Sequence, residues 1–391
     1  MLVDIVSIIR TIRRYIVLPP KRSKHTGGIY RMAYELQEAR ELVIRAGLEL
    51  SESGLIARTW GNISARISDT QFVITPSGRA YEDLTPDQIV ITNIEDCSYE
   101  GSVKPSSEKW IHADAYKLRP EVNFVIHTHQ NYASALSILG DTVLEVPKSS
   151  SFEALLGPVV PTAGYGPNGS QELSRNVIEA ISGSPSSSAL LMANHGAECL
   201  GTDYDNAFAI AHALEDLSRA RYRSLIRMSL AYGLILPTDE EIAEEDSLGS
   251  DLSRYYEISE GGYGGAPFTA LSRAPFTVSA SKIAVPMLYP YLDDQAQIAG
   301  TDLPILEESA DKDEIQEALR DRNAVLIRGK GAVCTGASAE DVEAAAMVLE
   351  KGCRAAMLAR VQGNVPPLSA EHAKADRIAY ITSYSKLKDE R

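Results

Sequence analysis

The sequence predicts a mixed α/β fold in which helices cover a largely antiparallel sheet, and two patterns indicate it. Short β-rich runs at residues 62–67, 72–75 and 89–94 are separated by turn signals, which is typical of meandering antiparallel strands. Apolar residues recur at helical spacing over residues 30–50, and the pattern becomes helical again over 106–118. Helices and strands therefore follow one another in a mixed order, which favours an α/β/α sandwich.

The later part of this region continues the same alternation. Residues 122–126 form an apolar run that predicts a strand ending in His127-Thr128-His129, and a further helix is expected from Tyr132. Residues 189–193 predict another buried strand, which Asn194-His195-Gly196 interrupts. A long helix is then expected from Asp203, the predicted N-cap, to Ala231.

Composition excludes several classes of protein. The 391-residue chain carries 38 Lys and Arg residues against 53 Asp and Glu residues, a net charge of −15. This excess of negative charge disfavours a surface that binds nucleic acid, while a local basic pocket for one small anion is still compatible with it. Four cysteines without a CxxC pair predict reduced thiols in a cytoplasmic protein. The length indicates two domains, although one large domain also fits it.

The N-terminal segment, residues 1–29, is amphipathic. Its apolar run from Ile5 to Ile9 is too short to span a bilayer, and the arginines follow the run instead of preceding it as in a signal peptide. We interpret the segment as a packed or frayed helix that ends at Pro19-Pro20, in preference to a membrane-surface anchor. No stable membrane insertion is expected.

Three histidines fall at the ends of predicted strands. His127 and His129 are two residues apart and so point to the same side of a strand, and His195 follows the next buried strand. Imidazole nitrogens suit Zn²⁺ and related ions, and three of them leave coordination positions for a substrate. Glu108 is the candidate for a nearby base or fourth ligand. Taken singly, each histidine is more often a satisfied polar group than a ligand, and we assign His112 such a structural role.

Three short motifs offer hydrogen-bond donors suited to a phosphate: Gly61-Asn62, Thr75-Pro76-Ser77-Gly78 and Lys104-Pro105-Ser106-Ser107. Each presents hydroxyl, amide or backbone N–H groups at a strand-to-turn or turn-to-helix junction. The third motif lies where we expect a helix to begin, and a helix N-terminus attracts anions. The alternative for each motif alone is that its polar residues only cap the helix or form turns.

An internal similarity links the two halves of the chain. Residues 189–201 align without gaps with residues 324–336, and the match continues into the next helix, where Glu215 faces Glu350. This predicts a partial repeat, with a chance match of two strand–turn–helix patterns as the alternative.

The second copy differs from the first where chemistry is expected. Lys330 stands at the position of His195, and no HxH pair follows residue 266, so we expect this copy to lack metal ligands and to have a structural role. An acidic run and a Gly-rich stretch precede it and are typical of a linker. The predicted order is therefore an N-terminal segment (1–29), a first domain (30–235), a linker (236–265) and a degenerate repeat (266–391).

Five motifs follow one another in the first domain: Gly61-Asn62-Ile63-Ser64, Thr75-Pro76-Ser77-Gly78, Lys104-Pro105-Ser106-Ser107-Glu108, His127-Thr128-His129 and Asn194-His195-Gly196. In this order they resemble the class II aldolase/adducin family. Its members include L-fuculose-1-phosphate aldolase, L-ribulose-5-phosphate 4-epimerase, and related dehydratases and decarboxylases. The resemblance covers about residues 30–230, and the residues after 266 resemble only the later half of the same domain.

The resemblance implies a class II aldolase-like sandwich and a divalent ion, Zn²⁺ or another such as Mn²⁺, Co²⁺ or Fe²⁺, held by His127, His129 and His195. It implies Glu108 as the catalytic acid/base, which also approaches the metal in the resting enzyme. The family's phosphate-binding positions match Asn62, Ser77, Gly78, Ser106 and Ser107. The implied reaction is aldol cleavage of a phosphorylated or otherwise anionic small ketose or keto acid through a metal-stabilised enediolate.

Other interpretations stay open at this point. The same intermediate serves a sugar-phosphate 4-epimerase, a dehydratase or a decarboxylase, although Glu108 favours the aldolase-like members because the epimerases carry Asp there. Ser150 falls where the fuculose enzymes have a second acid/base tyrosine, and Tyr165 or a residue of the repeat is the candidate substitute. A non-catalytic, adducin-like assembly protein is the third interpretation, and the intact histidine set argues against it. Because family active sites lie between subunits, we expect a homo-oligomer, such as a dimer of two-domain chains.

Overall fold

The computed structural model describes residues 33–56, 60–140, 143–227, 234–249, 251–263 and 265–384. These residues belong to one compact unit, Ala33–Arg391. The amphipathic segment expected at residues 1–29, with His25, lies outside the described residues, as does the expected end of the long helix at Ala231. Within the described residues, every helix is too short or too polar to cross a membrane. The four cysteines are buried and unpaired, as predicted.

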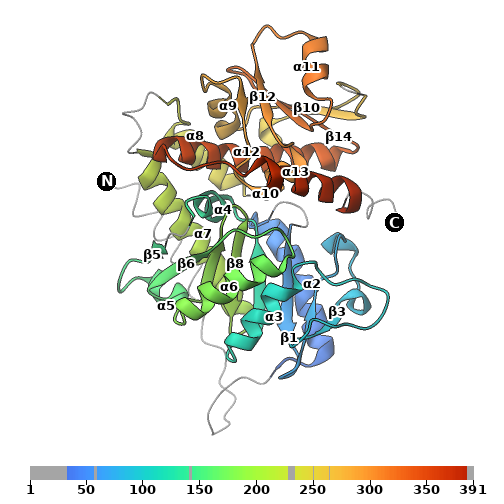
Figure 1. Cartoon of the computed structure of the whole chain (residues 1–391), viewed down its shortest axis with the longest axis vertical. Helices are drawn as coiled ribbons and strands as arrows, with labels where there is room; N and C mark the ends of the chain where they lie inside the picture. The colour runs from blue at the N-terminus through green and yellow to red at the C-terminus, as the bar shows by residue number, and fades with distance from the viewer. Residues whose placement is uncertain are drawn as a thin grey trace. The chain divides into compact units, whose positions relative to one another are not determined.

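Among the described residues, eight strands form the first sheet, in the order β3-β2-β1-β4-β8-β7-β6-β5 (Figure 1). Neighbouring strands are antiparallel except β6 and β7. The mixed fold with a largely antiparallel sheet is therefore confirmed. The strands are β1 (Gly61–Arg66), β2 (Gln71–Ile74), β3 (Val90–Asn93), β4 (Phe124–Thr128), β5 (Val143–Glu145), β6 (Val159–Ala163), β7 (Ala189–Met192) and β8 (Gly196–Gly201).

Helices cover both faces of this sheet because its strands carry apolar side chains on both faces. Along β4, Phe124 and Ile126 join the core on one face while Val125 joins the core on the other, as the two-residue period of a strand requires. The first face is covered by α2 (Leu36–Ser53), α4 (Asn131–Ser137) and α7 (Tyr204–Arg227), and the second by α3 (Lys109–Leu118) and α6 (Gln171–Gly183). The short helix α5 (Ser151–Leu156) contacts α7.

The helix expected from Ser106 begins three residues later, at Lys109. The backbone N–H of Ser106 donates to the carbonyl of Thr75 at 3.0 Å, and the N–H of Ser77 donates to the carbonyl of Lys104 at 3.0 Å. These bonds hold residues 104–106 as a bridge to the turn after β2. The predicted helix start at Ser106 is therefore wrong, because this segment is extended in a bridge in which Pro105 pairs with Pro76.

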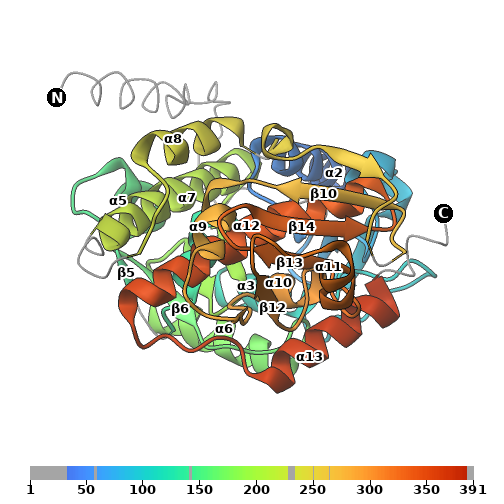
Figure 2. The same cartoon turned by 90° about the horizontal axis from the view of Figure 1, so that it is seen from above.

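The remaining six strands that the structure describes form a second sheet, in the order β11-β12-β13-β14-β10-β9. Figure 2 shows β10, β14, β13 and β12 side by side in that order. The strands are β9 (Ile258–Glu260), β10 (Phe268–Ser272), β11 (Met287–Leu288), β12 (Leu303–Leu306), β13 (Ala324–Ile327) and β14 (Gly331–Gly336). The helices are α8 (Asp239–Leu248), α9 (Pro275–Ser281), α10 (Asp293–Ile298), α11 (Lys312–Ala318), α12 (Ala339–Gln362) and α13 (Ala370–Ala379).

The two sheets share a pattern of connections. Strands β4 to β8 lie in the sheet order 4-8-7-6-5, and β10 to β14 lie in the equivalent order 10-14-13-12-11. The parallel pair falls at the same place in each, between β6 and β7 and between β12 and β13. Glu215 of α7 accepts from the backbone N–H groups of Tyr132 and Ala133 at the start of α4, as Glu350 of α12 accepts from those of Phe276 and Thr277 at the start of α9.

The segment expected as a linker, residues 236–265, instead contains regular structure. Thr238 and Glu241 form a capping box at the start of α8, and the acidic first turn of this helix complements the positive end of its dipole. Further along, β9 pairs with β10 in the second sheet. The acidic run is therefore the start of a helix and not a linker, because negative charges are favourable in the first turn of a helix.

The two halves share one continuous hydrophobic core, formed by the α4 and α7 side of the first sheet and the α9 and α12 side of the second. Arg354 of α12 crosses this junction and is 1% exposed. Its guanidinium forms an ion pair with buried Glu245 of α8 at 2.5 Å and lies 4.5 Å from the ring centroid of Tyr132 in the first half. Its backbone carbonyl accepts from the hydroxyl of Tyr222 at 2.9 Å.

We expect Arg354→Met to lower the free energy of unfolding by about 3–5 kcal/mol, because it leaves the carboxylate of Glu245 buried without a counter-ion. Urea unfolding followed by circular dichroism measures this. Arg320→Met is the matched control, since Arg320 pairs with Glu317 at the surface, where such pairs contribute little. Equal losses in the two variants would contradict the assignment of Arg354 as the junction residue.

Candidate functional site

The three strand-end histidines lie at one end of two neighbouring strands. His127 is in β4, His129 follows it directly, and His195 precedes β8, which pairs with β4. Asn194 takes the left-handed conformation, with φ 60°, in the turn that brings His195 back toward β4. Gly196 is required there, because a Cβ atom would lie 2.2 Å from the carbonyl oxygen of Thr128.

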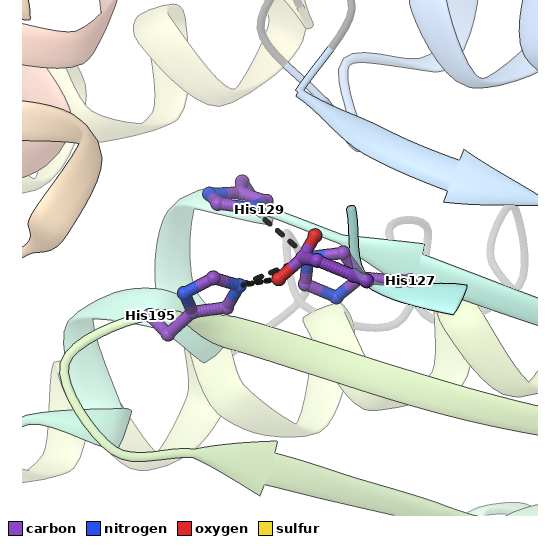
Figure 3. Close-up of side chains that lie close together, drawn as sticks. His127, His129 and His195 are labelled. Atoms are coloured by element: carbon purple, nitrogen blue, oxygen red, sulfur yellow. Dashed lines mark hydrogen bonds and ion pairs between the residues drawn. The ribbon is translucent and has the colours of Figure 1, made fainter. Parts of the chain in front are cut away.

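The rings of these histidines converge on one point, as Figure 3 shows. The Nε2 atom of His127 lies 3.0 Å from that of His129 and 3.1 Å from that of His195. Glu108, which immediately precedes α3, places Oε2 at 3.3 Å from Nε2 of His127 and Oε1 at 3.1 Å from Nε2 of His195. All four side chains are buried, and their ligand atoms lie within 4.8 Å of one another.

This donor set fits a divalent cation. Two imidazole nitrogens that face each other at about 3 Å can share at most one proton, so lone pairs point toward the centre of the cluster. The carboxylate of Glu108 is buried among these imidazoles, with Oε1 at 3.1 Å from Nε2 of His195. A buried carboxylate is costly unless a cation compensates it. Three imidazole nitrogens and a carboxylate oxygen suit Zn²⁺ and similar ions. These residues can therefore hold a metal.

The outward nitrogen of each ring contacts an oxygen atom. Nδ1 of His127 donates to the carbonyl of Ala197 at 2.9 Å. Nδ1 of His129 lies 3.3 Å from Oδ2 of Asp294, and Nδ1 of His195 is bonded to Asp293. Sequence reasoning missed both aspartates, because they lie in α10, about a hundred residues after His195, in a segment without a recognised motif.

A chain of buried hydrogen bonds orients Glu108 from behind. His112 lies in α3, one helical turn after Glu108, and donates from Nε2 to Oδ1 of Asn62 at 2.5 Å. The amide of Asn62 in turn donates to Oε2 of Glu108 at 2.9 Å. Nδ1 of His112 is bonded to the hydroxyl of Ser64 at 2.7 Å, which in turn contacts the hydroxyl of Tyr116 at 2.8 Å. The structural role assigned to His112 is thus to position the Asn62 amide.

Burial and neighbouring charges set the protonation of these groups. Burial, reinforced by nearby His127, lowers the pKa of His112 to about 3, so this ring is neutral at pH 7. Burial likewise lowers the pKa of His129 to about 4, against the effect of Asp294. Burial opposes ionisation of Glu108, but His127 and His195 hold the pKa of its carboxyl well below the usual range. Glu108 is therefore a carboxylate, as a metal ligand or a base must be.

A small cavity of about 60 Å³ opens beside the cluster. It is much smaller than the roughly 300–1,000 Å³ of a pocket for a drug-sized ligand, so it suits a compact group. All five residues expected to bind phosphate line it: Asn62, Ser77, Gly78, Ser106 and Ser107. Glu108 and His129 form part of the same wall, so the expected anion pocket and the histidine cluster are contiguous.

Five further residues of this wall were missed: Trp60, Arg79, Tyr81, Asn168 and Gln297. Arg79 follows Ser77-Gly78 directly, and a cation beside an expected phosphate turn was a signal that the sequence did offer. Gln297 belongs to α10 and had no such signal. Ser150 caps α5 by accepting from the N–H of Glu153, and Tyr165 packs against the ring of His372. Neither is among the residues that line the cavity as described.

Comparison with known proteins assigns the chain to a family. Residues 41–222 and 272–357 match the family described as "Class II Aldolase and Adducin N-terminal domain". The chain belongs to this family. The first matched segment contains the three histidines and Glu108, and the second contains Asp293 and Asp294.

Individual relatives from this family match about half of the chain. It is 34% identical over 206 residues to the 5-deoxy-D-ribulose 1-phosphate aldolase of Bacillus thuringiensis serovar kurstaki, a match that spans 52% of the chain and 92% of that relative. It is 33% identical over 201 residues to the L-fuculose phosphate aldolase of Escherichia coli strain K12, spanning 51% and 89%. A solved L-fuculose 1-phosphate aldolase matches with 29% identity and a TM-score of 0.44, over 56% of this chain and 98% of that one.

We expect the protonation of His112 to make the protein sensitive to acid. The unfolded chain takes up a proton at this residue near pH 6.5, whereas the folded protein does so only near pH 3. Stability from this residue is thus present above pH 6.5 and falls by about 1.4 kcal/mol per pH unit between pH 6.5 and 3. Urea unfolding of the metal-free wild type and of His112→Gln at several pH values measures it. The advantage of the wild type over the variant should shrink as the pH falls, and a constant difference would contradict a neutral buried His112.

Proposed function

We propose that the protein is a divalent-metal-dependent aldolase that cleaves a small phosphorylated ketose. The observation that carries the proposal is the convergence of three imidazole Nε2 atoms and the Glu108 carboxylate beside a cavity of polar residues. The relatives named as aldolases of 5-deoxy-D-ribulose 1-phosphate and L-fuculose phosphate support this reaction class.

In this proposal, His127, His129 and His195 hold the metal through Nε2. The bound ion would supply Lewis-acid polarisation of a carbonyl oxygen. Glu108 takes or returns the proton at its carboxylate oxygens. The Asn62 amide fixes the orientation of Oε2, while Oε1 faces Nε2 of His195 at 3.1 Å. Burial of all four side chains excludes water from the proton that Glu108 carries.

The cavity wall binds the phosphate of the substrate. Ser77, Ser106 and Ser107 provide hydroxyl groups, and Gly78 brings the backbone close with a φ of 69°. Arg79, exposed at the rim, adds a positive charge that attracts a phosphate. This local charge matters because the chain as a whole has a net charge of −15. The place of Glu108 and His129 in the same wall would bring the phosphate close to the reacting carbons.

We further propose that residues 266–391 are a degenerate partial repeat of the first half. The shared strand order, the matched helix caps at Glu215 and Glu350, and the second family match at 272–357 support it. In the sheet register, Leu271 and Arg273 stand where His127 and His129 do, so the copy has no such ligands. A homo-oligomer and a cytoplasmic location remain our proposals, the latter supported by the four unpaired thiols.

The test of the reaction is Glu108→Gln. With zinc supplied in excess, we expect the wild type to cleave a ketose 1-phosphate such as L-fuculose 1-phosphate or 5-deoxy-D-ribulose 1-phosphate, and the variant to be about 10²–10⁴-fold slower because it has no base. His127→Ala combined with His129→Ala should lose both metal and activity. Chromatography of the products decides the reaction type: two fragments support a lyase, whereas an isomer alone would assign a 4-epimerase.

The test of the phosphate pocket is Ser77→Ala combined with Arg79→Met. Losing hydrogen bonds to a charged group should raise KM for the phosphorylated ketose by about tenfold or more, with no comparable change for the same sugar without its phosphate. Steady-state kinetics with both sugars measures this. The matched control, Arg175→Met, removes an exposed arginine of α6 outside the pocket and should leave both KM values unchanged. An equal change for the two sugars would refute the pocket.

A further inference from the structure

The start of α10 lies against the histidine cluster, although it comes from the second half of the chain. Asp293 and Asp294, its first two residues, are both fully buried. The carboxylate of Asp293 is bonded to Nδ1 of His195, and Oδ2 of Asp294 lies 3.3 Å from Nδ1 of His129. Two of the three rings therefore take their outward partner from a different half of the chain, whereas His127 takes its partner from the first half.

Backbone hydrogen bonds tie this segment to the turn that carries His195. The N–H of Asp293 donates to the carbonyl of Asn194 at 3.0 Å, and the side-chain amide of Asn194 donates to the carbonyl of Tyr291 at 2.8 Å. Asp293 also accepts the N–H of Asp294 through Oδ1 at 2.6 Å, so Oδ2 is the oxygen turned to His195. Bonds to its backbone and to its carboxylate thus fix the orientation of Asp293 relative to the ring of His195.

The second aspartate is balanced by a buried cation. Lys351 of α12 forms an ion pair with Asp294, and its Nζ donates to the carbonyl of His129 at 3.2 Å. Lys351 and Asp294 are both almost completely buried. Because burying a charged group costs several kcal/mol, such a pair persists where its geometry is closely held. The lysine therefore holds both the carboxylate and the backbone of the histidine that the carboxylate contacts.

The other end of α10 is fixed by the C-terminal helix. Arg377 of α13 donates to the carbonyls of Gln297 and Ile298 at 2.7 and 2.9 Å, which are free acceptors at a helix C-terminus. Gln297 itself lines the cavity beside Glu108. Thus α10 is held between the histidine turn, α12 and α13, and a shift of this helix would move the partners of two rings together.

We propose that Asp293 and Asp294 are positioning residues of the metal centre, which the second half of the chain completes. By accepting from Nδ1 of His195 and His129, they fix the tautomer in which Nε2 carries a lone pair and hold each ring in its orientation. The inference rests on the proposed function, since it assigns these residues a role toward the same metal. In this inference the second half of the chain supplies no metal ligand but orients two of the histidines that do.

The experiment measures the zinc affinity of the full-length protein by competition with a chromophoric chelator. We expect Asp293→Asn and Asp294→Asn each to weaken zinc binding by about 10–100-fold, the usual effect of removing such a partner. Asp302→Asn is the matched control, since Asp302 is an aspartate of the second half that pairs with Arg322 away from the histidines. Its zinc affinity should equal that of the wild type.

The double variant Asp294→Asn with Lys351→Met guards against a loss of folding. It removes both members of the buried ion pair, so no charge is left uncompensated, and circular dichroism verifies that it folds. A folded double variant with weakened zinc binding supports the positioning role, because a merely structural role would leave the affinity unchanged.

The outcomes separate this inference from the proposed function. Zinc affinities within about threefold of the wild type in the Asp293 and Asp294 variants, together with loss of zinc in His127→Ala, would overturn the inference and leave the metal centre standing. No zinc binding by the wild type itself would overturn the proposed function and the inference with it.

Discussion

Three imidazole nitrogens that face one another inside the protein are the constraint on which the site depends. At separations of 3.0 and 3.1 Å, the Nε2 atoms of His127, His129 and His195 have no room for a proton each, and they are shielded from water. Such an arrangement persists only if every ring is held from its other side. The carbonyl of Ala197 and two carboxylates do this, and the Asn62 amide does the same for Glu108. These contacts keep the three rings and the carboxylate directed at one point.

The fold supplies these supports from separate places. Pairing of β4 with β8 brings the HxH motif beside the Asn194–His195 turn, and the bridge between residues 75–77 and 104–106 places Glu108 across from them. The helix α3 then carries His112 into contact with Asn62. Each support is a local consequence of strand register or of a turn, so the site is assembled by rigid elements and not by long loops.

The second half has an unusual place in this arrangement. It matches the same family and shares the strand order of the first half. It nevertheless carries Leu271, Arg273 and Lys330 at the positions that correspond to His127, His129 and His195. A continuous core and the Arg354 junction fix it against the first half. This rigid contact is what allows two aspartates of a short helix to reach histidines far away in the sequence. A half of the chain that lacks these histidines can in this way still support the geometry of the cluster.

The sequence by itself determined the three histidines and the glutamate that meet in the structure, and much of the fold around them. The antiparallel strands, the long helices and the HxH motif at the end of β4 follow from periodicity and turn residues, which act over a few residues. It did not determine that residues 236–265 contain α8 and β9, because an acidic run is equally typical of a linker and of the first turn of a helix. Only the tertiary structure brought Asp293, Asp294 and Lys351 to the histidines. Their positions depend on how two sheets pack across a shared core, and no pattern along the chain records a contact between residues so far apart.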